Sequence, residues 1–147
     1  MVKIQMVRRN SFARVTRVTA SGYTGKKYKQ KSFINCNSTN VIYMLTCPYG
    51  KAYIGQTKRC LKVRISEHKT AIRTGNTEYA MAKHYLEAKH GSASSLRLVG
   101  VEQVTATTTR GSNLPNVLSQ REMFWIHELN TMQPQGLNYD FSFKPYL

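Results

Sequence analysis

The sequence predicts an α+β domain whose elements run in the order strand, strand, helix, helix, strand, helix. Three observations support this: β-branched and aromatic runs that suit strands, apolar residues spaced as on a helix face, and turn residues between the two kinds of segment. The chain has 147 residues, 41% of them hydrophobic, so it is long enough to form one domain with its own core.

The first two strands, Asn40–Thr46 and Ala52–Gly55, are predicted to form an antiparallel hairpin. Pro48-Tyr49-Gly50 lies between them and is a turn signal. A turn centred between Pro48 and Tyr49 makes the numbers of paired residues sum to about 97. Tyr43 and Tyr53 are therefore expected to be near neighbours across the hairpin.

Three helices and one more strand follow. Lys58–Thr74 is predicted to be a helix that Gly75 ends, with Arg64 and His68 one turn apart beside its apolar stripe. Its stripe consists of Leu61, Ile65 and Ile72. The other predicted elements are a weaker helix Thr77–Lys89, a strand Leu96–Val104, a polar loop Thr105–Asn113 and a helix Asn116–Asn130, followed by an irregular segment to Leu147.

Glu122 lies within the apolar face of the last predicted helix. That face contains Leu118, Trp125, Ile126 and Leu129. A buried carboxylate without a partner is costly or takes up a proton. Glu122 is therefore expected to bind a metal ion, to join a hydrogen-bond cluster, to pair with Arg121 or with an arginine of another helix, or to stay hydrated at the rim.

The positive charge lies almost wholly in the first part of the chain. Of 22 Lys and Arg residues, 14 precede the first acidic residue, Glu67, and after that point 8 basic residues balance 7 acidic ones. A one-sided field of this kind attracts phosphates, so we expect a nucleic acid as partner and no membrane. The alternative is that the basic segment only keeps the chain soluble.

The composition also divides the chain and indicates its compartment. Residues 1–32 have few large apolar groups and are predicted to form a flexible basic arm with a turn at Ser21–Lys27, whereas residues 33–147 form the folded domain. No apolar run approaches the ~18 residues of a membrane span, and the start lacks a signal-peptide segment. Three cysteines are too few for a disulfide framework, which favours a reducing compartment.

Several motifs together resemble the GIY-YIG nuclease superfamily. They are Val41-Ile42-Tyr43, Tyr53-Ile54-Gly55, Leu61-x-x-Arg64-x-x-x-His68, the isolated helical Glu122 and Gly136-Leu137-Asn138. The first motif begins with Val41 where the family pattern has Gly. The resemblance covers about residues 40–138 and implies a small three-stranded antiparallel sheet flanked by helices.

A closer resemblance is to the endonuclease domain of Penelope-like retroelements. It rests on the stretches Asn40–Pro48, Arg64–His68 and Arg121–Ile126. It implies a DNA endonuclease that nicks one strand for retroelement integration in the nucleus, with a reverse-transcriptase domain as partner. The basic arm adds RNA as a further partner. The alternative is a non-catalytic basic DNA- or RNA-binding module on the same fold.

The resemblance implies a role for each site residue. Tyr43 is the general base or orients the attacking water, assisted by His68, and Tyr53 contacts the water or the scissile phosphate. Arg64 neutralises the phosphate, for which its planar fork is suited. Since a phenol has a pKa of ~10, Tyr43 needs nearby cations to lower its proton affinity, and Arg64 and His68 are the candidates.

The same resemblance assigns Glu122 and Asn138. Glu122 holds one hydrated Mg²⁺ or Mn²⁺ at the leaving oxygen, and Asn138 closes the site through contacts with the phosphate or a tyrosine. Each residue has a plainer alternative. The two tyrosines would be packing partners, Arg64 a solvated charge, His68 a satisfied surface histidine and Asn138 a turn residue.

A second metal site is predicted from Cys36, Cys47, His84 and His90. The spacing of the two histidines falls within the range of structural zinc sites, although the gap between the cysteines is wide. In the Penelope-type domains a second cysteine follows shortly after the first, at the place of Tyr49 here, so Cys36 is expected to supply the missing thiolate. The alternative is two buried cysteines beside two histidines on a hydrated helix.

Overall fold

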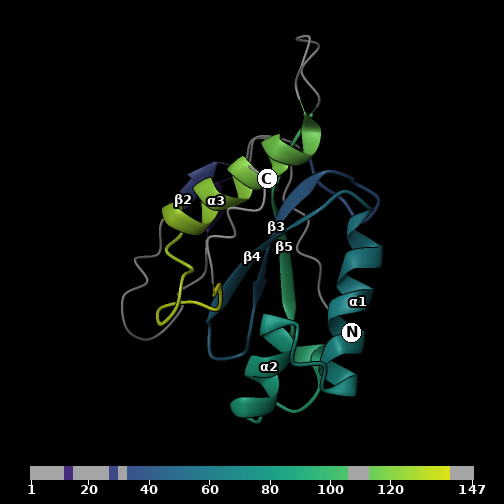
Figure 1. Ribbon diagram of the computed structural model, residues 1–147, viewed down its shortest axis with the longest axis vertical. Coiled ribbons are helices and arrows are strands. Elements are labelled where there is room, and N and C mark those ends of the chain that lie inside the picture. The colour runs from purple at the N-terminus through teal and green to yellow at the C-terminus, as the bar shows by residue number, and fades with distance from the viewer. Residues whose placement is uncertain (1–11, 15–26, 30–32, 106–112, 140–147) are drawn as a thin grey trace.

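The computed structural model describes residues 12–14, 27–29, 33–105 and 113–139. Its main sheet is antiparallel, with the strand order β4-β3-β5. The strands are β3 (Val41–Thr46), β4 (Ala52–Thr57) and β5 (Arg97–Gln103). Each predicted strand is confirmed with ends that differ by at most two residues. β3, which contains Tyr43, is the central strand, and Figure 1 shows the three strands between the helices.

Three α-helices flank the sheet in the predicted order. They are α1 (Leu61–Thr74), α2 (Ala80–Glu87) and α3 (Leu114–Glu128), with a single 3₁₀ turn, η1 (Ala93–Ser95), before β5. α1 begins three residues later than predicted, because β4 continues to Thr57 and Cys60 is the N-cap residue. It ends at Gly75, whose φ of 68° suits glycine at this position.

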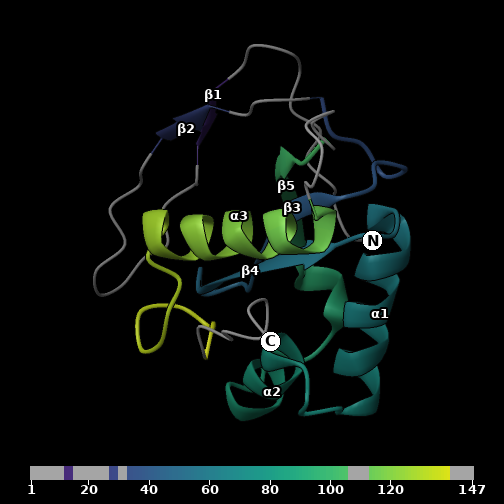
Figure 2. The ribbon, with the colours of Figure 1, turned by 45° about the horizontal axis from the view of Figure 1, so that its top comes forward.

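The sheet is covered on both faces. On one face, β3 and β4 pack against Leu118, Trp125, Ile126 and Leu129 of α3, which confirms the predicted core face of that helix. On the other face, Val41, Tyr43 and Leu45 pack against α1 and α2. Figure 2 shows α3 running across β4 while α1 and α2 group apart from it. The central strand therefore has almost no exposed side chain.

The register of the hairpin differs from the prediction by one residue. Tyr43 pairs with Gly55, and Tyr53 pairs with Leu45. Gly50 has a φ of 88°, and the five residues from Cys47 to Lys51 close the turn, so its centre falls on Tyr49. Tyr43 and Tyr53 are diagonal neighbours on the same face rather than directly opposed.

The free edge of β4 is covered by the segment that follows α3. The Leu137 N–H donates to the carbonyl of Ala52 at 2.9 Å, and the side chain of Asn138 bonds to both the N–H and the carbonyl of Ile54. These bonds satisfy backbone groups that an edge strand otherwise exposes. The segment therefore fixes the strand that carries Tyr53.

Part of the predicted N-terminal arm is described. β1 (Phe12–Arg14) and β2 (Lys27–Lys29) pair as a two-stranded antiparallel sheet. Apart from these short strands the predicted flexible arm lies outside the described residues, as do residues 106–112 of the predicted loop and residues 140–147. Within the described ranges, no helix has the length and apolar character needed to cross a bilayer.

Candidate active site

The hydroxyl of Tyr43 is the centre of a buried cluster. Tyr43 is fully buried, and its Oη lies 2.8 Å from Nε2 of His68 and accepts a 3.0 Å hydrogen bond from Nε of Arg64. Both partners come from α1, one turn apart, so the helix aims them at the same phenol. His68 is 2% exposed, which rules out the surface histidine that the sequence left open.

One direction in this cluster is set by chemistry. Arg64 can only donate, so the Tyr43 oxygen accepts from it, whereas the donor in the bond between Tyr43 and His68 depends on the tautomer of the imidazole. Burial, helped by the charge of Arg64, lowers the pKa of His68 to about 4, so this ring is neutral near pH 7 and its Nε2 can accept.

Arg64 lowers the pKa of Tyr43, as expected, but other effects outweigh it. Burial raises the pKa of the Tyr43 hydroxyl, and the neighbouring Tyr53 adds to the rise. The other expected cation, His68, is neutral and contributes no positive charge. Tyr43 is therefore a neutral phenol in the free protein, not a phenolate that is already formed.

Tyr53 lies beside this cluster on β4. It is half-buried, and its ring makes an edge contact with His68 at 6.0 Å between centroids. Burial and the charge of Glu122 raise the pKa of Tyr53 to about 12. Between the phenols lies Gly55, where a Cβ would stand 2.5 Å from Tyr43 Oη and 2.9 Å from the ring of Tyr53. Only glycine leaves room for both rings.

Glu67 contacts a second nitrogen of the Arg64 guanidinium, in addition to the one that bonds to Tyr43. Its Oε2 accepts from Nη1 of Arg64 at 2.8 Å, and its Oε1 pairs with Arg59. The Tyr79 ring lies 5.7 Å from the Arg64 guanidinium carbon. The sequence reasoning missed Glu67 and Tyr79, although the i,i+3 spacing of Arg64 and Glu67 was a usable signal.

Glu122 reaches the site from α3. It is half-buried, and its Oε2 accepts a 2.9 Å hydrogen bond from Gln56, which also donates to Ser119 at 3.1 Å. In the described part of the chain no lysine or arginine pairs with Glu122, because Arg121 forms its ion pair with Glu102 at 2.8 Å. Gln56 is a further residue that the sequence reasoning missed.

Glu122 influences the titration of both phenols. Its charge raises the pKa of both Tyr43 and Tyr53, while burial raises the pKa of Glu122 itself against the effects of Gln56 and Arg64. The hydrogen bond from Gln56 attaches Glu122 to β4, the strand that also carries Tyr53. Groups that lie far apart in the sequence therefore meet at this strand.

A cavity of about 410 Å³ opens at this edge. Its walls are Gln56, Thr57, Lys58, Arg59, Arg64, Pro115 and Ser119. It connects the guanidinium group of Arg64 with the amide that holds Glu122. A phosphodiester entering the cavity meets cationic and neutral polar side chains.

Asn138 has other contacts than those expected. Its side-chain amide bonds to the backbone of Ile54 in both directions at 2.9 Å, and its Oδ1 also accepts from Thr131 at 2.7 Å. The residue is 5% exposed, and the expected contact with a tyrosine is not made among the described residues. Its side chain therefore holds β4 through hydrogen bonds and is not among the described residues that line the cavity.

Comparison with known families fits this geometry. Residues 39–138 match the model of the GIY-YIG catalytic domain. The chain belongs to the GIY-YIG family. GIY-YIG domains are nuclease domains, which implies DNA as substrate, and they generally use divalent metal ions. No curated protein and no solved structure matched the chain in two further comparisons.

In this GIY-YIG domain, the Glu122 carboxylate suits a divalent cation of the magnesium type. It is an oxygen ligand with one oxygen held by Gln56 and with no described cation neutralising it. Mg²⁺ commonly binds through one or two carboxylates and keeps several water molecules. The donor chemistry therefore fits, with Glu122 as the protein ligand.

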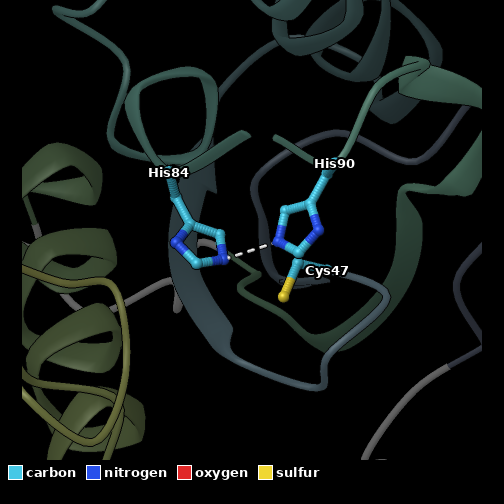
Figure 3. Close-up of side chains that lie close together, drawn as sticks. All are labelled: Cys47, His84 and His90. Atoms are coloured by element: carbon cyan, nitrogen blue, oxygen red, sulfur yellow. Dashed lines mark hydrogen bonds between the residues drawn. The ribbon is translucent and has the colours of Figure 1, made fainter. Parts of the chain in front are cut away.

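A second group of metal-ligating side chains lies away from the catalytic cluster. One ligand atom each from Cys47, His84 and His90 lies within 4.8 Å of the others, and Figure 3 shows the thiol and both rings pointing toward one another. The two Nε2 atoms are 2.9 Å apart. The exposed Tyr49 packs its ring against His90 at 4.4 Å.

Cys36 does not join this group, so the predicted four-residue site is corrected to three. Cys36 precedes β3 and Cys47 follows it, so the strand lies between the two, and the grouped ligand atoms come from Cys47, His84 and His90 without Cys36. The carbonyl of Cys36 instead accepts from the N–H of Lys62 at the start of α1. All three cysteines of the chain are free thiols.

Proposed function

We propose that this GIY-YIG domain is a metal-dependent DNA endonuclease that hydrolyses phosphodiester bonds and nicks one strand at each encounter. The observation that carries the proposal is the cluster of Tyr43, His68 and Arg64 beside a cavity that is also lined by Gln56, the residue that holds Glu122. A single site of this size acts on one phosphate at a time.

Tyr43 and His68 move the proton in this proposal. As Tyr43 takes a proton from the attacking water, it passes its own hydroxyl proton to Nε2 of the neutral imidazole. The phenol therefore needs no lowered pKa in the free protein. Because Arg64 covers the hydroxyl, its movement toward the phosphate opens Tyr43 to the water, which Tyr53 orients.

Arg64 and Glu122 stabilise the charge on the phosphate. The guanidinium carries five N–H donors and uses two of them on Tyr43 and Glu67, which leaves others for phosphate oxygens. When bound to Glu122, Mg²⁺ or Mn²⁺ supplies positive charge at the leaving 3′ oxygen. Gln56 keeps the carboxylate aimed at that position.

The test is relaxation of supercoiled plasmid with Mg²⁺ or Mn²⁺. Wild type is expected to convert the plasmid to open circles, while Glu122→Gln and Arg64→Ala lower the rate about 100-fold or more. Glu87→Gln is the matched control, since Glu87 is an exposed carboxylate on α2. Retarded but intact DNA with wild type contradicts the proposal.

A non-catalytic DNA- or RNA-binding module is the second candidate. The net charge of +15 favours it as much as it favours a nuclease. It predicts equal retardation of DNA by wild type and Glu122→Gln with no cleavage at any metal concentration. The same plasmid experiment therefore separates the two candidates.

For the second metal group we propose a structural Zn²⁺ held by Cys47, His84 and His90. One thiolate and two imidazoles are ligands that zinc prefers, and a closed structural site takes one further ligand in addition to these three. Elemental analysis is expected to find one zinc per chain, lost in Cys47→Ser and retained in Cys60→Ser. Metal-free wild type, purified without chelator, contradicts this site.

We also propose the biological process in which this nuclease acts. The resemblance of Asn40–Pro48 and Arg121–Ile126 to Penelope-type domains supports nicking for retroelement integration in the nucleus, with a reverse-transcriptase domain and RNA as partners. A reverse-transcriptase reading frame adjoining this sequence in its genome is the expected result. A genomic context without any retroelement feature contradicts it.

A further inference from the structure

We propose that Arg59, together with Lys58, forms a second phosphate subsite that binds a backbone phosphate next to the scissile one, and that Glu67 positions Arg59 relative to Arg64. The inference rests on the proposed nuclease function and adds a contact that this function does not require. Its ligand is a phosphodiester of the same DNA strand.

The pairing of the two arginines is the first observation. One oxygen of Glu67 accepts from Arg64 at 2.8 Å, and the other oxygen pairs with Arg59. The two guanidinium groups thus contact different oxygens of one carboxylate. This shared contact sets the distance between the two guanidinium groups and their relative orientation. Arg64 is in turn fixed by Tyr43, so Glu67 transmits the position of the catalytic cluster to Arg59.

The second observation is that both guanidinium groups retain donors. A guanidinium has five N–H groups; Arg64 uses two on Tyr43 and Glu67, and Arg59 uses one on Glu67. The Arg59 side chain is 60% exposed, so a phosphate can reach it without displacing the carboxylate. Arginine suits this contact because its planar fork matches phosphate oxygens.

The cavity supplies the third observation. Lys58, Arg59 and Arg64 line the same 410 Å³ space, and no acidic side chain is among its described lining residues. The first N–H groups of α1 are already bonded to the carbonyls of Ser38 and Cys36. Phosphate binding here therefore depends on the basic side chains and not on the helix end.

The experiment uses the full chain and a short duplex whose nicked position has been mapped. Steady-state rates are measured over a range of salt concentrations. Arg59→Ala is expected to raise KM about tenfold, to change kcat much less, and to reduce the salt slope of binding by about 1. Arg59→Lys restores most of the salt slope because it keeps the charge.

Glu67→Gln distinguishes positioning from simple charge. Losing the carboxylate releases both arginines, so KM rises as in Arg59→Ala and kcat falls about tenfold as well, although the protein gains net positive charge. If Glu67 had only a structural role, Glu67→Gln would lower the stability of the protein without this combination of a raised KM and a lowered kcat. An unchanged KM in Glu67→Gln overturns the positioning role.

Neutral methylphosphonate linkages identify the phosphate. Placing one beside the scissile phosphate is expected to weaken binding by wild type about tenfold and to leave binding by Arg59→Ala nearly unchanged. The control Arg73→Ala removes a charge from the far end of α1 and keeps the wild-type response. If Arg59→Ala and wild type lose affinity equally, the subsite does not exist.

The two proposals fail in different ways. If wild type binds DNA but never cleaves it, the nuclease function fails, and a methylphosphonate placed at each linkage of the duplex in turn still decides the subsite from the affinities of wild type and Arg59→Ala. If wild type cleaves and Arg59→Ala behaves like Arg73→Ala in KM and salt slope, only the second subsite is overturned.

Discussion

At the scale of single residues, Gly55 decides the arrangement of the two phenols. Tyr43 pairs with Gly55 in the hairpin, and its hydroxyl lies over the position that a side chain would take. Tyr53 closes the same space from the side. Glycine is therefore required at position 55 because the rings of Tyr43 and Tyr53 fill the space of a side chain, and not because a backbone turn needs it.

Gly55→Ala is expected to lower the nicking rate at least 100-fold. The added methyl group displaces the Tyr43 hydroxyl from His68 and Arg64, and overpacking costs about 1–3 kcal/mol of stability. Nicking is measured below the melting temperature of the variant, which a thermal melt provides. A stable variant with wild-type activity contradicts the assigned role of the phenol.

His68 is the residue through which pH acts on stability. Its pKa is about 4 in the folded protein against an ordinary value near 6.5, because burial disfavours the charged ring. Between these values the unfolded chain binds a proton that the folded chain does not, so stability falls as the pH drops from 6.5 to 4.

The predicted loss from this group is about 3 kcal/mol between pH 7 and pH 4. Urea unfolding of wild type and His68→Phe at several pH values measures it, and the variant is expected to lose less stability on acidification. Equal slopes for the two proteins would mean that folding does not lower the pKa of His68.

At the scale of elements, α1 carries three polar residues of the site. Helical spacing places Arg64, Glu67 and His68 on adjoining turns, while Leu61 and Ile65 anchor the helix to the sheet. β4 contributes Tyr53 and Gln56 from opposite faces of one strand. The site thus depends on how firmly the edge of β4 is held.

Asn138→Ala tests the hold on β4. The substitution removes three side-chain hydrogen bonds and leaves the buried N–H and carbonyl of Ile54 unpaired. The expected cost is about 2–3 kcal/mol in free energy of unfolding, with a much smaller change in kcat. Urea unfolding and nicking assays measure both.

Thr131→Val is the partial control for this variant, since it removes only the bond from Thr131 to Asn138. It is expected to cost less than Asn138→Ala. If Asn138→Ala instead keeps its stability and loses most of kcat, Asn138 acts on the substrate directly, as the family resemblance implied.

At the scale of the whole molecule, the charge is divided between two regions. Most basic residues precede Glu67, and nine of them lie within residues 1–32. The cavity adds Lys58, Arg59 and Arg64 at the site itself. Long-range attraction and local phosphate contacts therefore come from different parts of the chain.

Deleting residues 1–32 is expected to weaken DNA binding and to flatten its salt dependence, while nicking at saturating DNA is retained. Each lost phosphate contact reduces the slope of log affinity against log salt by about 0.9. Binding titrations at several salt concentrations measure the change. An unchanged slope shows that the arm is not the main electrostatic contact.

The sequence was sufficient for the element order and for the core face of α3, because hydrophobic periodicity is a local property of the chain. Its resemblance to family motifs also predicted Tyr43, Tyr53, Arg64 and Glu122 as site residues, and their catalytic roles stay predictions. These predictions needed no knowledge of how far apart the motifs lie in space.

Only the tertiary structure decided the contacts between these motifs. Burial raises the pKa of Tyr43 and lowers the pKa of His68, so both rings are neutral near pH 7 and burial outweighs the expected effect of Arg64 on the phenol. The length of β3 separates Cys36 from Cys47, and Gln56 and Glu67 gain their roles only through partners that folding brings near. The sequence thus determined which chemical groups are present, and packing determined their protonation and their partners, because both depend on distance and burial.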